Sequence, residues 1–207
     1  MDVLSNARQH LAAADPILAR VITSTNASPP FTGHTNYYQA LVDSIISQQL
    51  SVKAAAAIEA RFKNLFENDF PSPEQIIEKD DELLRSVGIS RPKVRYIKDL
   101  AQHILDGTVR FDMFDSLDNE AIIQELTQVK GIGEWTAHMF LMFCMRRLDV
   151  LPVGDLGIRN GIQRLYKLPN TPSPEMVIEI ASQRHWHPYE SVASWYVWHS
   201  LDNAPKV

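Results

Sequence analysis

An aspartate that follows a loop of proline and glycine is the residue of this sequence best suited to do chemistry. Asp155 comes directly after Leu151-Pro-Val-Gly and precedes apolar residues at helical spacing, namely Ile158, Ile162 and Leu165. It is therefore expected to be the N-cap of a helix, which is also its purely structural interpretation. A carboxylate beside the positive end of a helix dipole is favoured in its ionised form. A catalyst that faces a developing cation needs that form.

Two glycines upstream form the second feature that could take part in binding or catalysis. Gly131 and Gly133 enclose one isoleucine and let the backbone approach a ligand closely, because glycine has no Cβ and accepts positive φ. The apolar residues on either side predict a helix, a tight hairpin and a second helix: Ile122, Leu126 and Val129 before, and Trp135, Met139, Met142 and Phe143 after. The start of the second helix favours a phosphate, with Lys130 and Thr136 beside it. Taken alone, the motif also fits an ordinary helical corner.

Helical periodicity in the rest of the chain supplies the elements that must position these two motifs. Apolar spacing predicts helices over about 37–49, 51–65, 90–106 and 188–201, and a polar loop from Thr23 to His34. N-cap residues are expected at Asp15, Ser51, Ser72, Ser90 and Asp118. The sequence thus indicates an all-α fold.

The amino-acid composition limits the classes of protein to which this chain can belong. The chain has 207 residues, of which 45% are hydrophobic, enough for one compact unit or two packed lobes. A single cysteine, Cys144, excludes an intramolecular disulfide and a four-cysteine zinc or iron–sulfur site, and its apolar neighbours predict a buried thiol. We expect no leader and no membrane partner, and a location in the cytoplasm with the bacterial nucleoid, or in the nucleus of a eukaryote.

Charge is distributed unevenly. The net charge of −5 argues mildly against a nucleic-acid partner, since phosphate contacts need lysine and arginine. Seven acids and one lysine lie between Glu67 and Glu82, whereas five basic residues and no acids lie between Arg85 and Lys98. The second stretch predicts a small basic footprint, although a solvated face is the simpler interpretation.

Together these motifs resemble the helix-hairpin-helix DNA glycosylases, and within that superfamily the 3-methyladenine DNA glycosylases. Gly131-Ile-Gly-Glu-Trp-Thr-Ala resembles the hairpin of that branch, and Leu151 to Asp155 its catalytic loop. The resemblance also covers Ser44 to Ala54 and Trp195 to Trp198, so it spans most of the chain. It implies two helical lobes with a DNA-binding cleft between them: residues 35–150 as the central lobe, and 1–34 with 151–207 as the second.

The resemblance also implies the roles of particular residues. Asp155 would be catalytic, and the altered base would contact Trp135, Trp198, Met139 and Tyr38. Gln49 would fill the gap left by the extruded nucleotide. Further DNA contacts would come from Ser51, Lys93, Lys130, Gly131, Gly133 and Thr136. No cofactor is expected beyond a sodium or potassium ion on the main-chain carbonyls of Thr127, Val129 and Ile132.

The activity implied is excision of alkylated purines from double-stranded DNA by a monomeric enzyme. Relatives that cleave the strand carry a lysine at the position of Trp135, so no Schiff base forms here and the enzyme is expected to be monofunctional. Glu190 stands where the family commonly has arginine, which puts any contact of that arginine in doubt. A non-catalytic helix-hairpin-helix module and a glycosylase for oxidised or mismatched bases remain the alternatives.

Overall fold

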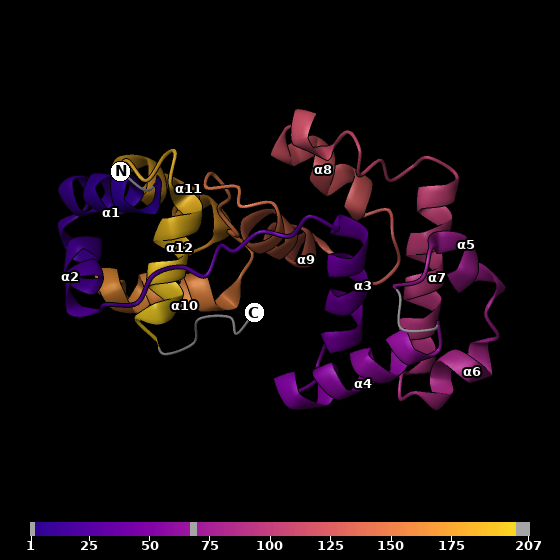
Figure 1. The fold of residues 1–207 in the computed structure, drawn as a ribbon. Coiled ribbons are helices and arrows are strands. Elements are labelled where there is room, and N and C mark those ends of the chain that lie inside the picture. Colours follow the sequence, from indigo (N-terminus) through magenta and orange to yellow (C-terminus); the bar gives the residue numbers. More distant parts are fainter. Residues whose placement is uncertain (1–2, 67–69, 202–207) are drawn as a thin grey trace. The chain divides into compact units, whose positions relative to one another are not determined.

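The computed structural model describes residues 3–66 and 70–201, and every regular element within these ranges is helical (Figure 1). The all-α prediction is confirmed. None of the helices in these ranges has both the length and the apolar character needed to cross a lipid bilayer.

The described residues divide into two compact units. The first holds the chain up to Gly33 and from Leu141 onward, and the second runs from His34 to Phe140. The expected central lobe, residues 35–150, is longer than the second unit, because residues 141–150 group with the terminal segments. The reason is local: the hydroxyl of Ser191, on the last helix, donates to Arg147 O and accepts from Val150 N, which ties this stretch to the C-terminal helix.

Helices of the first unit are α1 (Val3–Ala14), α2 (Pro16–Ser24), α10 (Leu156–Tyr166), α11 (Pro174–Gln183) and α12 (Glu190–His199). Those of the second are α3 (Tyr37–Ser47), α4 (Val52–Asn64), α5 (Pro73–Glu78), α6 (Asp81–Ser86), α7 (Arg91–Leu105), the 3₁₀ turn η1 (Phe114–Ser116), α8 (Asn119–Leu126) and α9 (Glu134–Met139). A π-helical turn, η2 (Phe140–Cys144), continues α9 and was not expected from the sequence.

Side-chain caps fix several helix starts where the sequence placed them. Asp15, Ser51, Asp118 and Asp155 each accept a hydrogen bond from a backbone N–H in the first turn of the following helix. Ser72 and Gln75 form the reciprocal capping box at α5. These predictions are confirmed, whereas Ser90 precedes α7 without a side-chain cap hydrogen bond.

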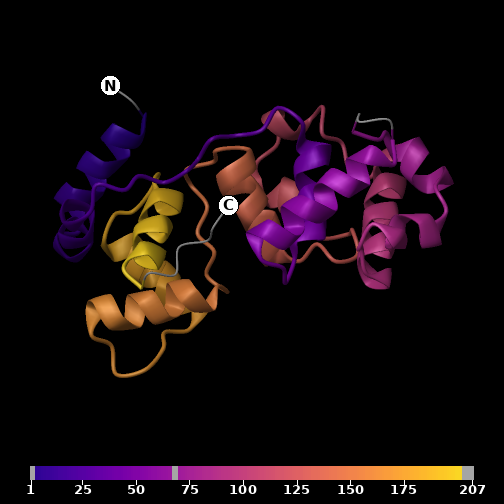
Figure 2. The same cartoon turned by 60° about the horizontal axis from the view of Figure 1, so that its bottom comes forward.

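Close packing of α12 against α10 organises the first unit, where the yellow and orange helices cross in Figure 2. Gly161 of α10 makes this approach possible, since a Cβ there would lie 2.5 Å from Val197 Cγ1. Trp186, Tyr196 and Trp198 are among the largest side chains buried in the described chain.

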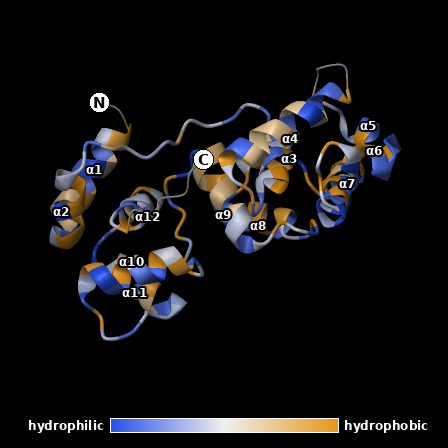
Figure 3. Ribbon diagram, turned by 90° about the horizontal axis from the view of Figure 1, so that it is seen from below, coloured by the Kyte–Doolittle hydropathy of each residue, from blue (hydrophilic) through white to orange (hydrophobic). Residues whose placement is uncertain are grey.

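Helix α7 is the central support of the second unit, in contact with α3, α5 and α6. It is strongly amphipathic, and Figure 3 shows hydrophilic and hydrophobic residues side by side along it. Val94, Ile97, Leu100 and Ala101 form its buried stripe. This arrangement leaves other side chains of α7 available to hold neighbouring loops.

Candidate active site

Asp155 is held by two hydrogen bonds at the start of α10. Its Oδ1 accepts from Ile158 N at 2.7 Å, the capping bond, and from the indole Nε1 of Trp198 at 2.8 Å. The first bond comes from three residues along the chain and the second from α12, 43 residues away. The carboxylate is thereby fixed in direction, with both donors on the same oxygen.

A glycine allows the indole to reach the carboxylate. A Cβ on Gly157 would lie 3.0 Å from both Asp155 Oδ1 and Trp198 Cδ1. This is tighter than ordinary van der Waals contact, so a larger residue would push the indole and the carboxylate apart. Gly157 and Gly161 lie one turn apart on α10 and both face α12. Neither role is evident from the sequence pattern around these glycines alone.

Trp198 differs from its expected role as a base-stacking surface. It is 2% exposed, and its indole N–H is committed to Asp155. A buried tryptophan must find an acceptor for its single donor, and Asp155 provides it. Trp198 is therefore buried with its only N–H donor on Asp155, and its contact with the altered base stays a prediction.

The loop that leads to Asp155 is anchored to the start of α12. Ser191 Oγ donates to Arg147 O at 2.7 Å and accepts from Val150 N at 3.1 Å, and Ser191 N donates to Leu148 O at 2.9 Å. Its neighbour Glu190 lies 3.0 Å from His187 Nδ1 through Oε1. In this chain the glutamate thus makes a local contact within the start of α12.

In the second unit, the turn between α8 and α9 has the predicted hairpin form. Gly131 has φ +84°, and a Cβ there would lie 2.2 Å from Tyr96 Cδ2. Both the backbone conformation and the ring of Tyr96 thus require glycine at this position. Gly133 has φ −93° and no neighbour within 4 Å of an added Cβ, and it precedes the first residue of α9.

The hairpin is anchored to α7 by Asp99, a contact that no sequence motif indicates. Its Oδ2 accepts from Lys130 N at 2.8 Å, and its Oδ1 accepts from Lys130 Nζ at 2.7 Å. Burial alone would raise the pKa of Asp99, but the hydrogen bonds and charge of Lys130 outweigh it and lower that pKa. Lys130 stays exposed next to the hairpin.

The predicted DNA-facing segment between α3 and α4 is exposed and strained. Gln49 has φ +59°, a left-handed conformation that is rare for a residue with a side chain. Leu50 and Val52, which flank the cap residue Ser51, are exposed apolar side chains. Gln48 Nε2 donates to Gly131 O at 3.0 Å, so this segment and the hairpin are in direct contact.

Lys93 does not lie as expected for a phosphate contact. Its Nζ donates to Ile46 O at 2.8 Å and to Gln48 O at 2.6 Å, and so closes the C-terminal end of α3. Burial lowers the pKa of this ammonium. Since two of its three N–H groups are used within the protein, its main partner is the α3 carboxyl end.

Helix α9 separates its residues into an outer and an inner face. Trp135 is 51% exposed, while Thr136 is buried at 9%. The Thr136 side chain thus has little exposed surface, and its phosphate contact stays a prediction. Met139 is half-buried at the end of the helix.

Comparisons with known proteins identify the family of this chain. Residues 42–186 match the HhH-GPD superfamily base excision DNA repair protein model. DNA-3-methyladenine glycosylase 1 of Schizosaccharomyces pombe is 37% identical over 94% of this chain and 86% of the relative. This chain belongs to the HhH-GPD superfamily, in its DNA-3-methyladenine glycosylase branch.

Solved structures of the superfamily have the same fold. The DNA-3-methyladenine glycosidase of Bacillus halodurans superposes with a TM-score of 0.81 at 37% identity, covering 94% of this chain and 88% of its own. The 3-methyladenine DNA glycosylase of Schizosaccharomyces pombe, in complex with abasic DNA, gives 0.79 at 35% identity over 98% and 99%.

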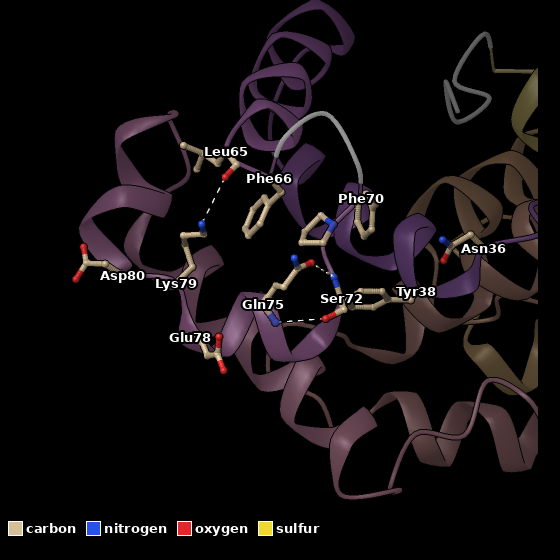
Figure 4. Close-up of a pocket in the computed structure, with 11 residues that line it drawn as sticks. Asn36, Tyr38, Leu65, Phe66, Phe70, Ser72, Gln75, Glu78, Lys79 and Asp80 are labelled. Carbon is tan, nitrogen blue, oxygen red and sulfur yellow. Dashed lines mark hydrogen bonds between the residues drawn. The ribbon is translucent and has the colours of Figure 1, made fainter.

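Tyr38, a predicted base-binding residue of this HhH-GPD protein, lines a pocket within the second unit. Figure 4 shows it in a pocket beside Phe70 and Ser72, with neither Trp135 nor Met139 in the lining. Its ring packs edge-to-face on Phe70 at 5.5 Å, and burial raises the pKa of its hydroxyl. The first turn of α3 directs the side chain toward α5, which sequence spacing alone does not reveal.

Most basic side chains of the stretch from Arg85 to Lys98 form ion pairs or hydrogen bonds within the protein. Arg85 pairs with Glu82 at 2.5 Å, and Lys98 pairs with Asp81 at 2.5 Å. The acidic run therefore neutralises part of the expected footprint, and Glu67 and Asp69 of that run lie outside the described residues. Arg95 is exposed on α7.

The predicted cation on the hairpin carbonyls stays a prediction. Thr127, Val129 and Ile132 lie in the turns between α8 and α9, and Val129 O already accepts from Ile132 N at 3.1 Å. Within 3–66 and 70–201 there is no cluster of three or more His, Cys, Asp or Glu side chains suited to a metal ion.

Cys144 is buried, which raises the pKa of its thiol to about 12.

Proposed function

We propose that this protein is a monofunctional DNA glycosylase, which extrudes alkylated purines such as 3-methyladenine and 7-methylguanine and hydrolyses their N-glycosidic bond. The resulting abasic site would be passed on to base excision repair. The observation that carries the proposal is the Asp155 carboxylate, which two N–H donors hold at the N-terminus of α10 in a member of this family.

The substrate determines how much chemistry the protein must supply. A purine methylated at N3 or N7 carries a positive charge and is already a good leaving group. The C1′–N bond breaks, its electron pair leaves with the base, and the sugar becomes an oxocarbenium-like cation. Water then adds to C1′ and passes a proton to the Asp155 carboxylate, which returns it to solvent. A single carboxylate can stabilise the cation and orient the water, so Asp155 alone suffices as the catalytic residue.

Trp198 contributes through Asp155. The indole N–H donates to Oδ1 at 2.8 Å and so sets the direction in which the carboxylate meets the sugar cation. A carboxylate held in advance does not have to reorganise during the reaction. We assign Trp198 as a positioning residue.

Recognition of the base would use the exposed face of Trp135, with Met139 beside it. A cationic base gains cation–π attraction over an indole that a neutral base does not. Selection by charge and by the weakened glycosidic bond needs few hydrogen bonds, so several alkylated purines are accepted. A tryptophan has no amine to form an imine with C1′, so strand cleavage by β-elimination does not occur.

DNA contacts would come from the hairpin with Lys130, from Gln49 as the residue that enters the duplex, and from Ser51. The relative of known structure from Schizosaccharomyces pombe was solved with abasic DNA, which supports binding of the product. We propose that the protein acts as a monomer.

The test is release of bases from methylated duplex DNA. The wild-type protein is expected to release methylated purines without nicking the strand, and Asp155→Asn is expected to lower kcat by about 1,000-fold. Asparagine caps a helix about as well as aspartate, so the variant should keep its fold.

A matched control separates chemistry from capping. Asp118 caps α8 through Ala121 N at 2.8 Å, and Asp118→Asn should leave kcat within about twofold. No release by the wild-type protein would contradict the proposal and favour the binding module. Release of oxidised or mismatched bases only would favour the other class of glycosylase.

A further inference from the structure

Three residues spaced by three along α7 contact both of the exposed segments assigned above to DNA. Lys93 Nζ donates to the carbonyls of Ile46 and Gln48 at the end of α3. The ring of Tyr96 occupies the space next to Gly131. Asp99 accepts hydrogen bonds from the backbone and side chain of Lys130.

The two segments also contact each other. Gln48, whose carbonyl is held by Lys93, donates through Nε2 to Gly131 O at 3.0 Å. The contacts therefore close a ring that passes from α7 to the segment after α3, on to the hairpin, and back to α7. A shift of either segment changes the position of the other, because Gln48 and Gly131 each contact α7 and also contact one another.

We propose that Lys93 is a positioning residue, which sets the separation between the Gln48–Gln49 segment and the hairpin and thereby aligns both for one DNA backbone. The proposal rests on the function proposed above. Tyr96 and Asp99 fix the hairpin side of the same arrangement.

This role differs from that of an ordinary phosphate-binding lysine. Lys130 is 73% exposed at its side chain, as a phosphate contact requires, whereas Lys93 is half-buried against two carbonyl oxygens 2.8 and 2.6 Å from its Nζ. Its effect on DNA therefore passes through the backbone of residues 46–48. A phosphate contact depends on salt because counterions are released, but a contact within the protein does not.

The same helix offers a matched control. Lys98 Nζ donates to Lys79 O at 2.8 Å and pairs with Asp81 at 2.5 Å. Lys98→Met therefore removes a comparable lysine–carbonyl bond from α7, but the segments it joins to α7 lie around α5 and α6 and belong to neither the Gln48–Gln49 segment nor the hairpin. A difference in DNA affinity between Lys93→Met and Lys98→Met therefore depends on which segment the lost hydrogen bond held, and not only on the loss of a lysine–carbonyl bond.

The experiment measures affinity for a duplex that contains a tetrahydrofuran abasic analogue, together with kcat and KM on methylated DNA. Lys93→Met is expected to weaken binding about tenfold and to raise KM with kcat nearly unchanged, whereas Lys98→Met stays within about twofold. The slope of log affinity against log salt should be the same for Lys93→Met and wild type. Lys93→Arg should not restore affinity, because a guanidinium is too wide for the site of an ammonium.

Coupling across the ring gives a second readout. Gln48→Met combined with Lys93→Met should weaken binding by less than the product of the two single effects, since both act on the same segment. Independent effects, or equal losses for Lys93→Met and Lys98→Met, would overturn the proposal. A salt slope lower by about 1, with rescue by arginine, would instead make Lys93 a direct phosphate contact. If the wild-type protein fails to bind this duplex, the proposed function fails, and with it this role for Lys93.

Discussion

The two units hold their functional residues in different ways. In the first, a residue of the same helix turn and one neighbour on α12 fix the Asp155 carboxylate. In the second, the exposed segments owe their positions to a ring of contacts from α7, with Lys93, Asp99 and Gln48 reaching partners 31 to 83 residues away. A single carboxylate needs one fixed direction, whereas a DNA backbone needs several points held at set distances.

This difference has a consequence for mutation. Changes around Asp155 should act on kcat, because they alter the group that faces the sugar cation. Changes along α7 should act on DNA affinity and on the stability of the hairpin. A substitution near Asp155 that changes DNA affinity, or one along α7 that changes kcat, would contradict this difference between the two units.

The largest effect on stability is expected for Gly131→Ala. The new Cβ would lie 2.2 to 2.7 Å from atoms of the Tyr96 ring, at a residue with φ +84°. Overpacking and left-handed backbone strain together should lower the free energy of unfolding by about 2 to 4 kcal/mol. Denaturant unfolding measures this loss.

Gly133→Ala is the matched control in the same hairpin. Nothing lies within 4 Å of its added Cβ and its φ is −93°, so the loss should be about 1 kcal/mol or less. Equal losses at both glycines would mean that Tyr96 moves aside freely and that α7 does not hold the hairpin.

The sequence revealed these glycines as a pair but not their different roles. The pattern Gly-x-Gly predicts a hairpin, whereas the need for glycine at position 131 comes from Tyr96, which lies 35 positions earlier. Caps such as Asp155, Ser72 and Asp118 could be predicted because the donor lies within three residues of the acceptor. The fold class followed from the same local patterns.

What could not be predicted depends on contacts between distant segments. Lys93 belonged to a basic stretch and suggested a phosphate, but its ammonium reaches the carbonyl oxygens of Ile46 and Gln48. Trp198 suggested a stacking surface, yet packing of α12 on α10 buries it against Asp155. One signal was available: glycines at 157 and 161, one turn apart, indicate a close approach of another helix.

Trp198→Phe should reduce kcat by about 10- to 100-fold. The phenyl ring keeps much of the buried volume but removes the N–H that Oδ1 of Asp155 accepts at 2.8 Å. A hydrogen bond to a charged group is worth about 1.5 to 3 kcal/mol. Single-turnover rates on methylated DNA measure the loss, and KM should change little.

The control for this change is Trp195→Phe on the same helix. The Trp195 ring stacks on His199 with centroids 4.9 Å apart, and its loss should change kcat by about twofold or less. Parallel losses of kcat for both tryptophans would show that packing of α12, and not the bond to Asp155, supports the carboxylate.

A smaller and more selective effect is expected from the two glycines of α10. Gly157→Ala would place a Cβ 3.0 Å from Asp155 Oδ1 and from Trp198 Cδ1, so kcat should fall by about 3- to 10-fold. Gly161→Ala would press on Val197 and should lower stability by about 1 to 3 kcal/mol, with kcat of the folded protein nearly unchanged. Comparing kcat with the unfolding midpoint for both variants checks this split. The reverse pattern would place the sensitive contact at Val197 and not at the carboxylate.

The smallest effect concerns acid sensitivity of the hairpin. The folded-state pKa of Asp99 lies below its ordinary value of 3.8, because the hydrogen bonds and charge of Lys130 outweigh the effect of burial. The stabilisation it provides is therefore fully present above that value and is lost as pH falls through the lower folded-state pKa.

Wild type should exceed Asp99→Asn in unfolding free energy by about 1 kcal/mol near pH 6, and this difference should shrink near pH 2. Urea unfolding at both pH values measures it. A difference that does not change with pH would mean that Asp99 acts through its shape as an acceptor and not through its charge. In that case the loss in Asp99→Asn would come from the poorer fit of the amide to Lys130, and charge would drop out of the mechanism by which α7 holds the hairpin.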